Sequence, residues 1–272
     1  MKTNSVQTLL LSCILMTQLA LPAFSKNPPS NIKEKMISYK TGDVTSLAFV
    51  AYDANIKGKR PVVLVVHEWW GLNEYTKMRA RKLAELGYLA MAVDLFGNGK
   101  TAANPKEAQE LTTPFYKDPQ LARKRLDAAE TKIREFPEAD PANIAAIGYC
   151  FGGFIVLNDA KLGADLKGVV SFHGGLGGVT PDKNLLKAQI LVCHGGSDKF
   201  VSMNDLETFK HQLDSIGANY TVRVYANATH AFTNPESTNN GKRFSMPIEY
   251  NATADKDSWD DMKAFLKKIF GK

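Results

Sequence analysis

The chain has 272 residues, of which 44% are hydrophobic and 23% are charged, which is the composition of an ordinary globular protein. Its length suits one large α/β domain better than two small ones. The net charge of +6 comes without a basic block or a basic stripe interleaved with aromatic residues, which argues against nucleic acid as a partner.

Residues 1–25 have the layout of a secretory signal peptide. Lys2 precedes an apolar run from Leu9 to Leu21, and small residues near Ser25 suggest cleavage after that position. The apolar run is shorter than the roughly 20 residues of a membrane span, so we expect no stable span. Residues 26–272 then form a single mature domain in a periplasmic or secreted protein.

A second interpretation of the leader is a lipoprotein-processing site at Leu10-Leu11-Ser12-Cys13. The residues after Cys13 stay hydrophobic, whereas a lipidated mature chain normally begins with a polar tether, so we favour simple cleavage. Without Cys13, only Cys150 and Cys193 remain. Two cysteines are too few for a disulfide framework. Cys193 lies in a short apolar strand and is expected to be a small buried hydrophobic residue.

The first two predicted strands, residues 36–39 and 44–52, flank a Gly42-Asp43 turn and form an antiparallel pair at the edge of a larger sheet. The pattern then changes to short, continuous apolar runs, which are typical of strands buried on both faces. Strands of this kind are predicted at residues 61–66, 89–93, 144–148, 168–172 and 190–193, and an alternating strand at 220–225.

Helices are predicted between these strands, at residues 75–86, 106–136, 154–160 and 258–269. The long region 106–136 is expected to break near Pro114 and Pro119, because a proline ring is incompatible with a continuous helix. Strands alternating with helices predict a mostly parallel sheet with helices on both faces. Ligands in such sheets bind at the carboxyl ends of the strands, so residues just after each strand are the candidates for chemistry.

The segment Gly148-Tyr149-Cys150-Phe151-Gly152-Gly153 follows a buried strand and precedes a helix. It matches the nucleophile elbow G-x-S-x-G, with cysteine in place of serine. The sharp turn lifts the nucleophile above the sheet, and the amide dipoles of the following helix favour a thiolate. A glycine-rich turn can also serve packing or phosphate binding, but the known phosphate-binding glycine patterns are absent. Cys150 is therefore the candidate nucleophile.

Hydrolases with this elbow place the acid and the histidine later in the chain, in that order. Asp198 follows the strand at 190–193, and His230 follows the strand at 220–225. An acid in this role orients the histidine and stabilises its charged form. The alternative interpretations are that Asp198 belongs to a turn or caps a helix, and that His230 is a histidine of a surface loop.

The other four histidines, His67, His173, His194 and His211, are assigned no catalytic role. His67 and His194 end strands and brace them, His173 could line the cleft, and His211 lies on a predicted helix. None is spaced for metal binding, and His67-Glu68 lacks the second histidine of H-E-x-x-H. We expect no metal and no cofactor.

The loop that begins His67-Glu68-Trp69-Trp70 is where this fold provides a second oxyanion donor. We expect the amide of Trp69 to pair with the amide of Phe151 in an oxyanion hole. Glu68 is unusual here, because a carboxylate beside an oxyanion hole is electrostatically unfavourable unless it serves the thiol.

Five motifs together, H-E-W-W-G-L-N, D-L-F-G, G-Y-C-F-G-G, H-G-G-S-D and A-T-H-A-F, resemble the dienelactone hydrolase family. The resemblance extends from about Lys33 to the C-terminus. It implies an α/β-hydrolase fold, with an eight-stranded, mostly parallel sheet flanked by helices on both faces. By the same resemblance, Cys150, Asp198 and His230 form a triad, and Glu68 helps to deprotonate the thiol when substrate arrives.

This sequence departs from the family pattern at the residues that recognise the substrate. The founding activity of this family recognises a substrate carboxylate with two arginines, one shortly after the D-L-F segment and one a few residues beyond the catalytic histidine. Here residues 97–100 read Gly-Asn-Gly-Lys and residues 231–234 read Ala-Phe-Thr-Asn, with no arginine in either. Dienelactone itself is therefore not expected as the substrate, and the specificity is expected to reside in the stretches 96–120 and 234–250.

The sequence thus predicts an exported hydrolase that acts on a small carboxylic ester or lactone through an acyl-cysteine intermediate. The alternative is a hydrolase-fold protein without turnover that binds a ligand or uses an oxidisable thiolate as a redox group. Steady turnover of p-nitrophenyl acetate that iodoacetamide abolishes would favour the enzyme. The oligomeric state is left open.

Overall fold

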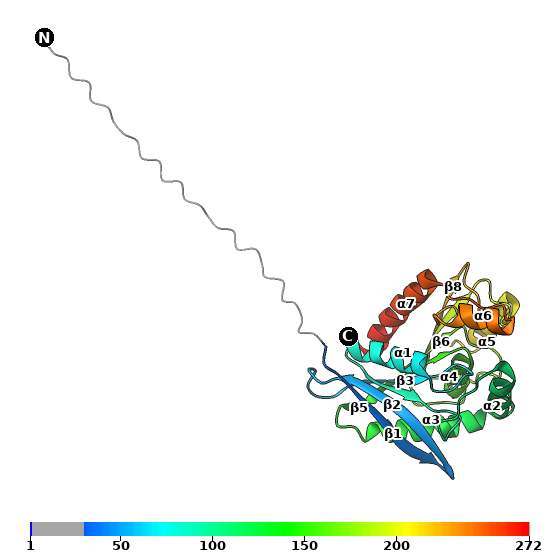
Figure 1. Cartoon of the computed structure of the whole chain (residues 1–272), viewed down its shortest axis with the longest axis horizontal. Coiled ribbons are helices and arrows are strands. Elements are labelled where there is room, and N and C mark those ends of the chain that lie inside the picture. Colours follow the sequence, from blue (N-terminus) through cyan, green and yellow to red (C-terminus); the bar gives the residue numbers. More distant parts are fainter. Residues whose placement is uncertain (2–29, 272) are drawn as a thin grey trace.

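The computed structural model describes Met1 and residues 30–271 (Figure 1). In this part of the chain, eight strands form one sheet and seven helices pack on it. The strands are β1 (Ile32–Thr41), β2 (Val44–Asp53), β3 (Arg60–Val66), β4 (Leu89–Val93), β5 (Ala139–Tyr149), β6 (Gly168–Phe172), β7 (Gln189–Gly195) and β8 (Tyr220–Tyr225). The helices are α1 (Glu74–Glu85), α2 (Pro105–Lys117), α3 (Pro119–Arg134), α4 (Phe151–Lys161), α5 (Met203–Ser215), α6 (Ser237–Phe244) and α7 (Ala252–Phe270).

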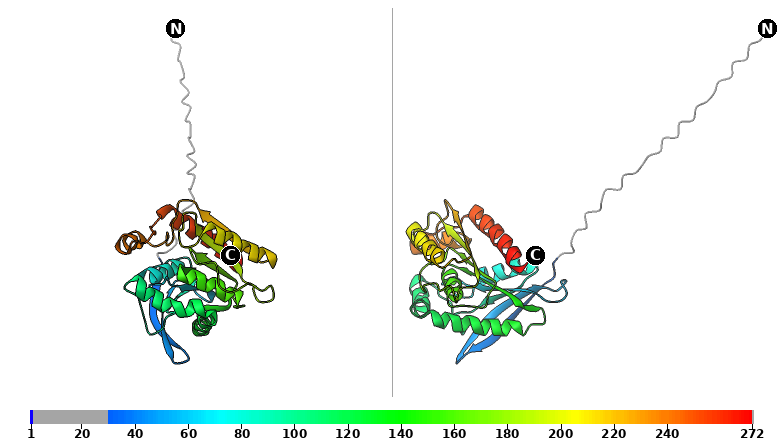
Figure 2. Two further views of the ribbon diagram at one scale, coloured as in Figure 1. Left: turned by 90° about the vertical axis from the view of Figure 1, so that its right-hand side faces the viewer. Right: turned by 180° about the vertical axis from the view of Figure 1, so that it is seen from behind.

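The strands lie in the order β1-β2-β4-β3-β5-β6-β7-β8. The β1–β2 hairpin is antiparallel and extends along one edge of the domain, and β2 also runs antiparallel to β4 (Figure 2). All pairs from β4 onward are parallel. The predicted eight-stranded, mostly parallel sheet is confirmed. Its parallel strands all end at the same edge, which is where the candidate site residues were sought.

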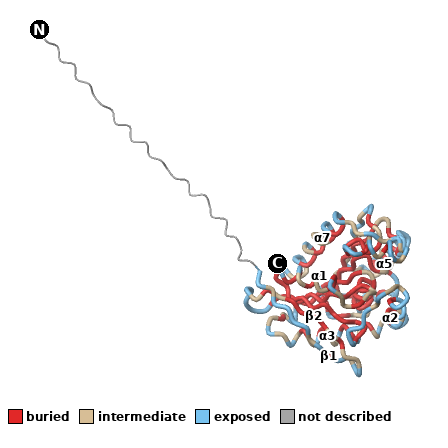
Figure 3. Tube along the Cα trace, in the orientation of Figure 1, coloured by how far each residue is buried: buried red, intermediate tan, exposed pale blue. Residues whose placement is uncertain are grey.

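The continuous apolar runs arise because helices cover both faces of the sheet. In β3, Val62 and Leu64 point to a core shared with α2, α3, α4 and α5, whereas Val63 and Val65 point to a core shared with α1 and α7. All four side chains are fully buried, and the burial is concentrated along the central strands (Figure 3). Each such side chain stabilises the fold by about 1.5–3 kcal/mol relative to exposure.

One prediction about the helices is wrong in part. The break between α2 and α3 lies at Asp118, with Pro119 as the first residue of α3, but α2 continues through Pro114. The proline leaves the carbonyl of Glu110 without an amide partner. Both residues lie on the exposed side of α2, where water can hydrate that carbonyl, so the helix tolerates the ring.

Two helical segments differ from the sequence expectations. α7 starts six residues before the predicted residue 258, because the side chain of Asn251 caps its first turn by accepting from the amide of Ala254. α6 was not predicted at all. Apart from Met1, the predicted signal peptide lies outside the described residues, and no helix within those residues is both long and apolar enough to cross a membrane.

Candidate active site

Cys150 is the single residue between β5 and α4, and its backbone is strained. Its φ of 52° and ψ of −113° lie in a region that non-glycine residues rarely adopt. The flanking glycines make this turn possible. A Cβ on Gly148 would lie 2.0 Å from the carbonyl oxygen of Gly152, and a Cβ on Gly152 would lie 2.3 Å from the carbonyl oxygen of Val66. Only glycine permits these approaches, so the motif fixes the cysteine at the end of the sheet.

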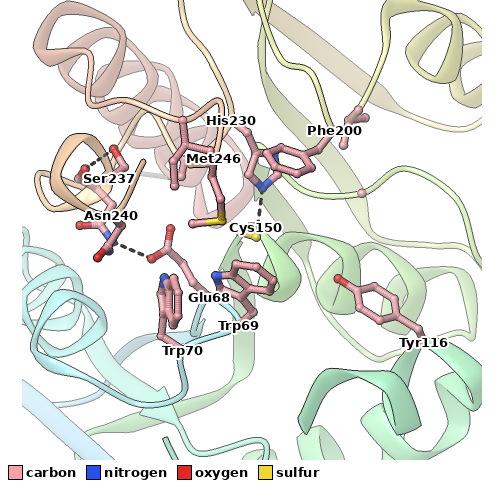
Figure 4. A pocket seen from close by; sticks show the side chains of 15 residues that line it. Glu68, Trp69, Trp70, Tyr116, Cys150, Phe200, His230, Ser237, Asn240 and Met246 are labelled. Carbon is pink, nitrogen blue, oxygen red and sulfur yellow. Dashed lines mark hydrogen bonds between the residues drawn. The ribbon is translucent and has the colours of Figure 1, made fainter. Parts of the chain in front are cut away.

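The three residues predicted as a triad form a chain of contacts through His230, although they follow three different strands. His230 Nε2 lies 3.0 Å from Cys150 Sγ (Figure 4), and His230 Nδ1 lies 2.8 Å from Asp198 Oδ2. The other carboxylate oxygen of Asp198 accepts hydrogen bonds from the amides of Phe200 and Val201, at 2.8 and 3.0 Å. Asp198 is thus fixed by its own loop while it orients the imidazole.

The electrostatics of this group favour a charged histidine. Burial by itself lowers the pKa of His230, but the adjacent charge of Cys150 and the hydrogen bond to Asp198 outweigh it and raise the pKa to about 10. Burial would raise the pKa of Asp198, yet its hydrogen bond to His230 holds that pKa below its ordinary value. At neutral pH the arrangement therefore favours an imidazolium at His230, held by the carboxylate of Asp198.

His173 connects the nucleophile to the histidine loop. Its Nδ1 accepts a hydrogen bond from the amide of Cys150 at 3.1 Å, so Nε2 carries the proton and donates to Thr233 Oγ1 at 2.7 Å. The hydroxyls of Thr233 and Tyr75 lie 2.6 Å apart. Burial lowers the pKa of His173 well below its ordinary value, which keeps the ring neutral. This network ties the backbone of Cys150 to the loop that carries His230.

Glu68 is the second residue after β3, and it is buried. Its Oε2 accepts a hydrogen bond from Asn234 Nδ2 at 2.6 Å. Burial raises the pKa of Glu68 to about 7, although Asn234 and the charge of His230 lower it. Glu68 and Cys150 line the same cavity, but the recorded hydrogen-bond partner of the thiol is His230 (Figure 4). The pairing of Glu68 with Asn234 was not predicted from the sequence. A sequence feature that could have indicated this pairing is the amide side chain of Asn234, four residues after His230.

The two predicted oxyanion donors come from adjacent segments. Gly152, at the start of α4, packs against the carbonyls of Val66 and His67, which brings the loop after β3 beside the helix start. Phe151 is the first residue of α4, so its amide has no carbonyl partner within the helix. Trp69 lies in a turn closed by the hydrogen bond from the amide of Gly71 to the carbonyl of Glu68.

A cavity of about 250 Å³ opens beside Cys150. Its walls come from both stretches that were expected to carry specificity, with Tyr116 from α2 and Asn240, Met246 and Ile248 from α6 and the segment after it (Figure 4). The lining residues are Glu68, Trp69, Trp70, Tyr116, Cys150, Gly175, Phe200, Val201, His230, Ala231, Asn234, Ser237, Asn240, Met246 and Ile248. The volume is that of a site for a small molecule.

The remaining candidates lie outside this cavity. His67 donates from Nδ1 to the carbonyl of Glu68 at 2.5 Å and accepts at Nε2 from the amide of Leu95 at 3.3 Å, so it braces the loop that carries Glu68. Cys193 is fully buried. Within residues 30–271, no three histidine, cysteine or acidic side chains are grouped so that they could hold a metal ion.

Comparison with known proteins shows the family of this chain. The model of the dienelactone hydrolase family matches residues 47–270. The crystal structure of P91, a dienelactone hydrolase-like promiscuous phosphotriesterase from metagenomic libraries, superposes with a TM-score of 0.82 and 32% identity, covering 88% of this chain and 98% of that one. A protein of Escherichia coli K12, provisionally named a carboxymethylenebutenolidase, is 30% identical over 243 residues, which is 82% of this chain and 83% of its own.

Proposed function

Since the chain belongs to the dienelactone hydrolase family and is thereby an ester or lactone hydrolase, we propose that it acts through a triad of Cys150, His230 and Asp198 and an acyl-cysteine intermediate. The observation that carries the proposal is the unbroken chain of contacts at the strained elbow, from Sγ to the imidazole at 3.0 Å and from the imidazole to Asp198 at 2.8 Å.

In the first step, Cys150 Sγ attacks the carbonyl carbon of the ester, and a new carbon–sulfur bond forms. The negative charge moves to the carbonyl oxygen, where the amides of Trp69 and Phe151 stabilise it. When the intermediate collapses, the carbon–oxygen bond to the leaving group breaks. His230 gives the proton on Nε2 to the departing oxygen, and an acyl thioester remains on the cysteine.

In the second step, neutral His230 takes a proton from a water molecule, and the resulting hydroxide attacks the thioester carbonyl. The carbon–sulfur bond breaks, the carboxylic acid leaves and the thiolate is restored beside the protonated histidine. Asp198 stabilises the imidazolium at each stage and keeps Nδ1 protonated. Glu68 lines the same cavity as Cys150, and its carboxylate helps to deprotonate the thiol when substrate arrives.

We propose in addition that the protein is exported, with residues 1–25 as a cleaved signal peptide. The charged residue followed by an apolar run and small residues supports this proposal. A periplasmic or extracellular site would place the enzyme where it meets small esters from outside the cell.

The function is tested with the purified mature protein and p-nitrophenyl acetate. We expect a burst of p-nitrophenolate equal to the concentration of Cys150, followed by steady turnover, because acylation of a thiolate precedes hydrolysis of the thioester. Iodoacetamide should abolish both phases and should modify Cys150 as judged by peptide mass spectrometry. Release of p-nitrophenolate that continues after complete alkylation of Cys150 would contradict the proposal.

A further inference from the structure

Among the residues that the structure describes, the lining of the cavity beside Cys150 offers no free cation to an anion. No lysine or arginine is among its lining residues. His230 can carry a positive charge, but its Nδ1 is already bound to Asp198 and its Nε2 to Cys150. Among the lining residues, Glu68 carries a carboxyl group, and it is buried. A carboxylate on a substrate would therefore meet a group of like charge and no available cation.

The walls of the cavity are instead apolar and largely aromatic (Figure 4). Trp69 and Trp70 pack edge to face with ring centroids 5.0 Å apart, and Trp70 stacks on Phe244 at 5.8 Å. These contacts hold both indoles in place. The large apolar side chains that line the cavity are Trp69, Trp70, Tyr116, Phe200, Met246 and Ile248. Surfaces of this kind bind hydrocarbon and aromatic groups by burying them from water.

We infer that the enzyme selects esters with an uncharged, apolar acyl group and excludes those whose acyl chain ends in a carboxylate. This inference rests on the proposed hydrolase function and adds the class of substrate to it. The physical reason is that an ionised carboxylate loses its hydration on entering the cavity and meets no free cation among the described residues that line it. The nearby Glu68 adds repulsion when it is ionised.

Three p-nitrophenyl esters separate charge from size: the hexanoate, the mono-ester of adipate and the adipate ester whose second carboxyl group is methylated. The adipate mono-ester is anionic, whereas the methylated ester is neutral and at least as long. At pH 8 we expect kcat/KM for the anionic ester to be about a hundredfold below that for either neutral ester, because an unpaired charge must be buried. Equal kcat/KM for the anionic and the methylated ester, within about threefold, would overturn the inference.

A positive charge placed in the cavity should reduce this selectivity. Asn240 lines the cavity from α6, whereas its neighbour Asn239 is exposed and is absent from the lining. We expect Asn240→Arg to raise kcat/KM for the anionic ester by about tenfold, through a charge-assisted hydrogen bond to its carboxylate. Asn239→Arg, the matched control, adds the same charge outside the cavity and should leave the selectivity unchanged. An equal gain in both variants would overturn the role of the cavity.

A binding measurement distinguishes failure of this inference from failure of the proposed function. If none of the three esters is turned over faster by the wild type than by Cys150→Ala, the proposed function fails. Protection of Cys150 from iodoacetamide by hexanamide and by the mono-amide of adipate then tests the cavity alone. Protection by the neutral amide only would uphold the selectivity, and equal protection by the two amides would overturn it.

Discussion

At the scale of single residues, the proposed chemistry depends first on the thiol of Cys150. Cys150→Ala should fold as the wild type does, because the side chain is only partly buried, but should retain less than about a tenth of the esterase activity. Cys150→Ser should also lose activity by about a hundredfold or more, because an alkoxide forms less readily than a thiolate. Steady-state turnover of p-nitrophenyl acetate measures both. A fully active serine variant would show that the thiol is incidental.

Glu68 is the second residue with a testable role. If its carboxylate supports the ionised pair of Cys150 and His230, Glu68→Gln should lower kcat/KM about ten- to a hundredfold at pH 7. Activity should recover towards pH 9, where hydroxide removes the thiol proton instead. The pH–rate profiles of the wild type and the variant provide the comparison. Coincident profiles would remove Glu68 from the mechanism.

The same carboxyl group should lower the stability of the fold at high pH. Burial raises the pKa of Glu68 from 4.5 to about 7, so the folded state keeps a proton that the unfolded state releases. Stability therefore falls as pH rises from 4.5 through 7. Glu68→Gln removes this penalty and should become more stable than the wild type by about 3 kcal/mol at pH 8, with little difference at pH 4.5.

Urea unfolding of both proteins at the two pH values tests this expectation. Glutamine can still accept the hydrogen bond from Asn234, so the comparison isolates the charge. A difference in unfolding free energy that is the same at pH 4.5 and pH 8 would show that Glu68 does not titrate in the folded protein as described.

At the scale of elements, the active site depends on how closely α4 approaches the end of β3. A Cβ at position 152 would lie 2.3 Å from the carbonyl oxygen of Val66, and backbone atoms cannot move away as a flexible side chain can. We expect Gly152→Ala to lower the unfolding free energy by about 3 kcal/mol and to reduce activity, because the helix start must shift. Thermal and urea unfolding, with esterase assays below the transition, measure both effects.

Gly177 provides the matched control for this substitution. It lies in the loop after β6, and a Cβ there would meet nothing within 4 Å. Gly177→Ala should change the unfolding free energy by less than about 1 kcal/mol and leave activity intact. If both variants behaved alike, the close packing of α4 on β3 would not be what holds the elbow.

At the scale of the whole molecule, the proposed export predicts a shortened mature chain. Expression of residues 1–272 in a bacterium with a periplasm should give a protein that begins at Lys26, because the small residues before that position suit a signal peptidase. The mass of the purified protein and fractionation of the cells provide the measurement. A full-length protein confined to the cytoplasm would contradict export, and a chain that begins at a lipid-modified Cys13 would identify a lipoprotein.

The sequence by itself determined the strands, the elbow and the order of Cys150, Asp198 and His230. These features are local, because buried strands need continuous apolar runs and a sharp turn needs glycines at fixed spacing. Since parallel strands end at one edge, the sequence also indicated that side chains following three different strands would be near one another. The mostly parallel sheet and its flanking helices could therefore be predicted without coordinates.

Only the tertiary structure decided which polar groups pair and what lines the cavity. The bond between Glu68 and Asn234, and the link from Cys150 through His173 to Thr233, join residues up to 166 positions apart. Tyr116 reaches the cavity from α2, a helix that the proline pattern had suggested was broken. Such contacts depend on how helices and loops pack on the sheet, and local periodicity carries no information about that packing.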